Sequence, residues 1–95
     1  MRIGVFYKNR RWAENWFKNF IEKLGDDAKV RTGINEMSVE YGPFYVVGFR
    51  AESSRGQRLD KAICEPCVYR DRDLVDRIIV PMLLNPLDVD YRFGE

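Results

Sequence analysis

The sequence predicts a small α/β domain, in which two main helices pack on a sheet with a central hairpin. Short alternating or continuous apolar runs predict the strands, and two longer segments with apolar residues every three or four positions predict the helices. The elements alternate along the chain, which favours helices packed on a sheet. A chain of 95 residues has room for one such domain, and we assign residues 1–95 to it.

The N-terminal third predicts a strand and then a long helix. Apolar residues fall on both faces of the strand at residues 3–7. Asn9 is the predicted N-cap of the helix and Gly25 its end. The helical stripe consists of Trp12, Ala13, Trp16, Phe17, Phe20, Ile21 and Leu24. Because both tryptophans lie on this stripe, we expect core packing rather than stacking on bases.

The middle of the chain predicts the remaining strands. Residues 29–32 form a short strand, and residues 37–41 and 44–49 form a hairpin around Gly42 and Pro43. Residues 62–64 are short and apolar, which indicates a buried strand.

The C-terminal third predicts a helix and a last strand. Asp71 or Asp73 opens the helix, and Pro81 kinks or ends it. The helix is expected to bury Leu74, Val75, Ile78 and Ile79. Residues 87–93 alternate between apolar and polar, so we predict a strand on the sheet edge or added to a neighbouring subunit, the latter making a homo-oligomer.

Charge and composition limit the functions open to the chain. Sixteen basic and fifteen acidic residues give a net charge of +1, so nucleic-acid binding is not favoured, because a large footprint needs a basic stripe. The absence of histidine excludes histidine-based catalysis and most zinc sites. Neither a signal peptide nor a membrane-spanning run is apparent, and two cysteines suit a reducing compartment. We therefore expect a cytoplasmic protein without membrane partners.

An arginine-rich loop is the candidate binding site. Guanidinium groups match phosphate in two parallel hydrogen bonds, and a glycine turn can direct backbone N–H groups at the same anion. The residues of this predicted ligand site are Arg50, Ser53, Ser54, Arg55, Gly56, Gln57 and Arg58. The alternative is a solvated turn in which the arginines pair with Glu52 and Asp60.

Cys64-Glu65-Pro66-Cys67 has the spacing of a redox dithiol. Such a motif sits where a strand meets a helix N-terminus, which lowers the pKa of the first thiol. We expect the helix to begin only after residues 68–70, so a structural role is favoured over redox activity. A zinc site would need two more ligands, and no cysteine or histidine remains to supply them. The carboxylates Asp73 and Asp76 are read as solvated groups on a helix face.

Roughly two thirds of the chain resembles the ATPase core of phage terminase large subunits and related helicase-like motors. The first strand and the aromatic helix resemble the segment that follows the first nucleotide-binding helix in that family, and residues 36–65 carry the motifs. The resemblance rests on the hairpin from Glu36 to Glu52, the Ser53-Ser54-Arg55-Gly56-Gln57-Arg58-Leu59-Asp60 loop and the strand ending in Cys64-Glu65. In that family the strand ends in the Asp-Glu of the Walker B site. The resemblance implies a degenerate P-loop-NTPase-like fold in a small phage protein.

The chain departs from that family where the family holds ATP. It contains no G-x-x-x-x-G-K-[ST] sequence, so the phosphate loop and its lysine are missing. Cys64 replaces the first acidic residue of the Walker B pair and leaves Glu65 alone to hold magnesium. We therefore expect no cofactor and no ATP hydrolysis.

Three functions remain open at this stage. The first is a non-catalytic, phage-type protein that holds a phosphate-bearing ligand through the arginine-rich loop, such as a host signalling nucleotide that it sequesters against a defence system. The second is a protein-interaction module that binds a host or phage protein through its sheet edge or C-terminal strand, as a defence antagonist or packaging accessory. The third, least favoured, is an enzyme using Glu65 or Cys64.

Overall fold

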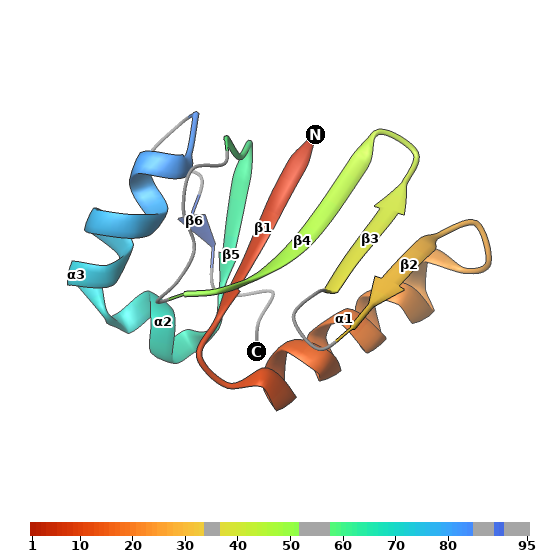
Figure 1. Ribbon diagram of the computed structural model, residues 1–95, viewed down its shortest axis with the longest axis horizontal. Coiled ribbons are helices and arrows are strands. Elements are labelled where there is room, and N and C mark those ends of the chain that lie inside the picture. The colour runs from red at the N-terminus through yellow and green to blue at the C-terminus, as the bar shows by residue number, and fades with distance from the viewer. Residues whose placement is uncertain (34–36, 52–57, 85–88, 91–95) are drawn as a thin grey trace.

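The molecule is a mixed β-sheet with helices, which confirms the predicted α/β class (Figure 1). The computed structural model describes residues 1–33, 37–51, 58–84 and 89–90. Along the chain, the elements are β1 (Arg2–Tyr7), α1 (Arg10–Leu24), β2 (Lys29–Thr32), β3 (Met37–Tyr41), β4 (Phe44–Arg50), β5 (Lys61–Cys64), α2 (Pro66–Arg70), α3 (Arg72–Leu74), the π-helical turn η1 (Val75–Ile79), the 3₁₀ turn η2 (Val80–Met82) and β6 (Val89–Asp90).

The strand order is β2-β3-β4-β1-β5-β6, so the first strand of the chain lies inside the sheet. Strand β1 runs parallel to both β4 and β5. The predicted hairpin is confirmed, because β3 pairs with β4 in antiparallel register from Ser38↔Val47 to Tyr41↔Phe44. Strand β2 continues the antiparallel half of the sheet and forms one of its edges.

The two faces of the sheet carry separate apolar clusters. Val5 and Ile63 belong to the cluster that packs against α1, whereas Phe6 and Cys64 belong to the cluster under η1 and η2. Because successive strand residues point to opposite faces, α1 and the α2–η2 segment cover opposite sides of the sheet. Figure 1 shows the α2–α3 segment beside β5 and β6, at the opposite end of the sheet from β2.

The caps predicted for the long helix are confirmed. The Asn9 side chain accepts a hydrogen bond of 3.0 Å from the backbone N–H of Arg11, and Gly25 ends the helix with φ of 79°. This φ suits glycine because it has no Cβ. Trp12 and Trp16 pack against the cluster on the α1 face, as the apolar stripe predicts.

The second helical segment begins earlier than the sequence analysis expected. Helix α2 starts at Pro66, directly after β5, and Asp71 caps the next helix by accepting a 3.2 Å hydrogen bond from the N–H of Leu74. Proline suits this first helical position because its φ is already helical and no N–H is needed there. The prediction that the helix opens at Asp71 is right for α3, but it missed the helical turn before it. Pro81 lies in η2, where the helical segment ends as predicted.

The C-terminal strand pairs within its own chain. Val89 and Asp90 form β6, which runs parallel to β5 in the register Ala62↔Val89. The sequence left open whether this strand joins its own sheet edge or a neighbouring subunit, and residues 89 and 90 join their own sheet edge. Residues 87, 88 and 91–93 of the predicted strand lie outside the described residues.

Gly4 in β1 has no room for a Cβ, because the side chain of Leu59, just before β5, lies against it. A Cβ at this position would lie 2.6 Å from Leu59 Cδ1 and 2.9 Å from Phe6 Cε2, and both side chains are buried. We expect Gly4→Ala to lower the free energy of unfolding by about 1–3 kcal/mol through overpacking. Urea denaturation measures the change. Gly33→Ala is the control, because no atom lies within 4 Å of its added Cβ, and an equal loss in both variants would contradict this account.

None of the helices formed by the described residues combines the length and apolar character that spanning a bilayer requires.

Candidate functional site

The structure separates the two described arginines of the predicted loop. Arg50 lies opposite Tyr7 at the carboxyl end of β1. Arg58 precedes Asp60, whose N–H donates to the carbonyl of Arg2 at the amino end of β1. At roughly 3.3 Å per strand residue, the five steps from Arg2 to Tyr7 put these ends about 16 Å apart. Arg50 and Arg58 are both exposed, but they do not form one cluster.

The other predicted site residues, Ser53, Ser54, Arg55, Gly56 and Gln57, lie outside the described residues. Their role in binding therefore remains a prediction.

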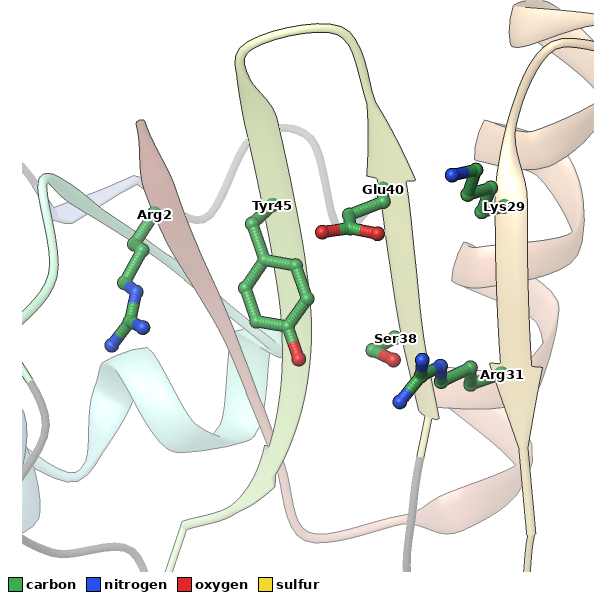
Figure 2. A pocket seen from close by; sticks show the side chains of 6 residues that line it. All are labelled: Arg2, Lys29, Arg31, Ser38, Glu40 and Tyr45. Carbon is green, nitrogen blue, oxygen red and sulfur yellow. The ribbon is translucent and has the colours of Figure 1, made fainter.

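A basic hollow lies on the sheet face opposite α1, over β1 to β4. Its volume is about 470 Å³, within the range of small-molecule sites. Figure 2 shows the side chains that line it: Arg2, Lys29, Arg31, Ser38, Glu40 and Tyr45. Three of these side chains are basic and one is acidic, so the hollow has an excess of positive charge although the whole chain is nearly neutral.

Strand register assembles this basic hollow. Arg2 lies opposite Tyr45, Tyr45 opposite Glu40, and Glu40 opposite Lys29, so one row of side chains crosses four strands. Residues opposite each other in a ladder point to the same face, which brings together residues far apart in the chain. Arg31 lies opposite Ser38 in the next row. The side chain of Ser38 is short and buried, so Ser38 forms the floor of the basic hollow.

The charged side chains of the basic hollow form no close ion pair with one another. Within the described part of the chain, no ion pair joins Lys29, Arg31 or Glu40 to another residue at 4.0 Å or less. The Arg2 guanidinium lies over the Tyr45 ring, 5.9 Å from its centroid. In Figure 2 the Arg31 side chain reaches from β2 toward Ser38. Opposite charges facing each other across strands can simply stabilise a sheet, but here the basic groups outnumber the single carboxylate.

Sequence reasoning missed the basic hollow because it depends on which strands become neighbours. The spacing of Lys29 and Arg31 in a predicted strand did indicate two basic side chains on one face. Nothing in the sequence pattern placed them on the same sheet face as Arg2, because that depends on the pairing of β1 with β4.

Glu65 lies at the carboxyl ends of β1 and β5. The residue is only 8% exposed, and Oε1 accepts hydrogen bonds of 3.0 Å from the backbone N–H groups of both Lys8 and Asn9. These groups connect β1 to α1, in the region where open α/β sheets commonly bind ligands. Glu65 therefore satisfies donors that would otherwise be available to a bound anion.

A surface ion pair lies near Glu65, because Lys8 also donates its backbone N–H to that carboxylate. Lys8 Nζ is 3.2 Å from Asp71 Oδ2. The hydrogen bond from the Leu74 N–H, followed by that from Lys8, holds the pKa of Asp71 below its ordinary value. Asp71 thus stays charged and ties α3 to the β1–α1 connection.

The cysteine motif does not have the features of a redox dithiol. Cys64 is fully buried in the apolar cluster under η1. Partial burial raises the pKa of the exposed Cys67 thiol, and the hydrogen bond and negative charge of Glu65 raise this pKa further, against a smaller lowering by Lys8. A reactive thiol needs a lowered pKa. The geometry therefore favours a structural role for Cys64, although α2 begins nearer to it than expected.

Removing the charge of Glu65 should activate Cys67. In Glu65→Gln the side chain keeps an acceptor oxygen, but the carboxylate charge that disfavours the thiolate is gone. We expect the rate of Cys67 alkylation by iodoacetamide at pH 8 to rise by roughly two- to fivefold, because the thiolate is the nucleophile. Mass spectrometry locates the label, and Cys67→Ser reports any reaction at Cys64. An unchanged rate would mean that Glu65 does not control this thiol.

No family model, curated protein or solved structure matches the chain. The described residues contain no group of three or more cysteine, aspartate or glutamate side chains placed to hold a metal ion.

Proposed function

We propose that this protein is a non-catalytic binding protein whose basic hollow holds a phosphate-bearing ligand. The observation that carries the proposal is that Arg2, Lys29 and Arg31 line one hollow on the same sheet face. Lys29 and Arg31 lie together on β2, and no described acidic partner is within ion-pair distance of either. Phosphate oxygens would supply the missing negative charge, and arginine can bind them through two parallel hydrogen bonds.

The uncharged lining groups suit the rest of such a ligand. The Tyr45 ring offers an aromatic surface beside the Arg2 guanidinium, on which a nucleotide base can stack. The Ser38 hydroxyl lies at the floor, near Arg31. Glu40 adds an acceptor that favours a ligand with N–H or O–H donors over a bare polyanion. A nucleotide has a base that can stack on Tyr45, N–H and O–H donors for Glu40, and phosphate oxygens that can accept from Ser38.

The predicted arginine-rich loop fits the same proposal. Its last arginine, Arg58, lies two residues before Asp60, whose carboxylate accepts a 2.7 Å hydrogen bond from the Arg2 N–H. Arg58 therefore lies near the end of the sheet where Arg2 lines the hollow. The resemblance to terminase ATPase cores suggests a phage origin but adds no phosphate site, because the phosphate loop is missing. We extend the proposal to a phage-encoded protein that sequesters a signalling nucleotide in the host cytoplasm.

Binding without turnover is supported by the position of Glu65. A catalytic carboxylate must reach its substrate, whereas Oε1 of Glu65 already accepts two backbone hydrogen bonds.

Calorimetric titration with mono-, di- and cyclic nucleotides tests the proposal. We expect Arg31→Ala to weaken binding by about tenfold to 150-fold, because a hydrogen bond to a charged group contributes roughly 1.5–3 kcal/mol. Lys18→Ala is the matched control, since Lys18 is an exposed basic residue on α1, across the sheet from the hollow.

The proposal would be contradicted if none of the nucleotides bound, or if Lys18→Ala and Arg31→Ala weakened binding equally. Arg55→Ala and Arg58→Ala separate the contribution of the loop from that of the hollow. If only these two variants lost binding and Arg31→Ala bound normally, the ligand would bind to the loop and not to the hollow.

A further inference from the structure

Strand β2 is an open edge of the sheet. Within the described part of the chain it pairs only with β3, so its outer backbone N–H and C=O groups remain available. All four of its residues are exposed, and Val30 is 43% exposed despite its apolar side chain. Such an edge can accept another extended segment, in which backbone hydrogen bonds supply affinity and alternate side chains supply specificity.

The charges on β2 discriminate between possible occupants. Lys29 and Arg31 project to the face of the basic hollow, while Val30 projects to the other face. An added strand would therefore present every second side chain to two positive charges and the intervening one to an apolar surface.

A second copy of this chain is a poor occupant of this edge. If two β2 strands pair antiparallel around a two-fold axis with matching faces, Lys29 of one lies opposite Arg31 of the other, or Arg31 lies opposite Arg31. Like charges directly opposite each other destabilise a pair of strands. Basic residues on an edge strand are a known protection against this association.

We propose that β2 is a docking edge for an extended acidic segment of a partner protein, with the pattern acid–apolar–acid. The acidic side chains pair with Lys29 and Arg31, and the apolar residue between them covers Val30. This interface does not depend on the proposed nucleotide site, although the two share Lys29 and Arg31. An acidic strand on β2 and a phosphate ligand in the hollow should consequently compete.

Fluorescence anisotropy with labelled seven-residue peptides tests this inference. The probe peptide has the order threonine, valine, aspartate, valine, aspartate, valine, threonine. One control peptide has lysine in place of each aspartate, and another has proline in place of the central valine, which removes a backbone donor while keeping the charge. We expect the aspartate–valine peptide to bind at least roughly tenfold more tightly than either control, and added salt to weaken its binding.

Charge reversal on β2 gives the sharpest comparison. In the double variant Lys29→Glu/Arg31→Glu, the preference should switch from the aspartate peptide to the lysine peptide. Arg2→Ala should leave peptide binding unchanged, because β1 is separated from β2 by β3 and β4, yet it should weaken nucleotide binding. These two readouts distinguish failure of the edge from failure of the hollow.

Several outcomes would overturn the inference. Equal binding of the proline and valine peptides would show charge attraction without strand addition. If the Lys29→Glu/Arg31→Glu variant still preferred the aspartate peptide, the peptide would bind somewhere other than β2. Dimerisation of the protein alone through β2, seen as concentration-dependent mass that Val30→Asp abolishes, would make a second copy the occupant.

Discussion

Truncation of Phe6 to alanine is expected to lower the free energy of unfolding by about 3–5 kcal/mol. Phe6 is fully buried on the interior strand β1 and stacks on Phe49 with ring centroids 5.3 Å apart. Its removal leaves a cavity between the sheet and the helical segment on that face, which the neighbouring elements cannot easily fill. Because small domains are stable by only about 5–15 kcal/mol, this loss is large.

Chemical denaturation of Phe6→Ala and Phe44→Ala measures this effect. Phe44 is 39% exposed at the start of β4, so its truncation should cost far less. Similar losses in both variants would contradict the assignment of Phe6 to the central core.

Replacement of Glu65 by alanine is expected to cost about 2–4 kcal/mol. The variant leaves the N–H groups of Lys8 and Asn9 without their acceptor. These hydrogen bonds are part-buried, and a hydrogen bond to a charged group contributes roughly 1.5–3 kcal/mol. Because the same bonds fix the connection between β1 and α1, the amides of residues 8 and 9 should exchange hydrogen faster in the variant.

Glu22→Ala is the matched control for Glu65→Ala, since Glu22 is an exposed carboxylate on α1. We expect its effect on stability to stay within about 0.5 kcal/mol. Unchanged stability and unchanged amide exchange in Glu65→Ala would show that the connection does not depend on this carboxylate.

The elements were predictable from sequence where the signal is local. The apolar stripe and caps of α1 follow from Asn9, Gly25 and the helical spacing between them. The alternation in residues 37–41, the nearly continuous apolar run in residues 44–49 and the break at Gly42 and Pro43 between them marked the hairpin. Helix α2 was missed because our prediction relied on aspartate caps. The available signal was Pro66, which also marks a helix start.

The position of the candidate site was not predictable from the sequence, and its phosphate-bearing ligand stays a prediction. The sequence favoured arginines and a phosphate-bearing ligand, but it placed them in one loop because they are close in the chain. The structure puts Arg50 and Arg58 at opposite ends of the sheet, and it places Arg2 on the same sheet face as Lys29, Arg31 and Ser38, with β4 between β1 and β3. Pairing of β1 with β4 creates this neighbourhood, and non-local pairing leaves no periodic signal in the sequence.

Binding of phosphate in the basic hollow is most directly tested by amide chemical shifts of ¹⁵N-labelled protein during titration with pyrophosphate at constant ionic strength. The account predicts shifts centred on Arg31, Ser38 and Tyr45, and their loss in the double variant Lys29→Ala/Arg31→Ala. An absence of shifts in these strands, or shifts centred on α1 or on the Lys8–Asn9 connection, would contradict it.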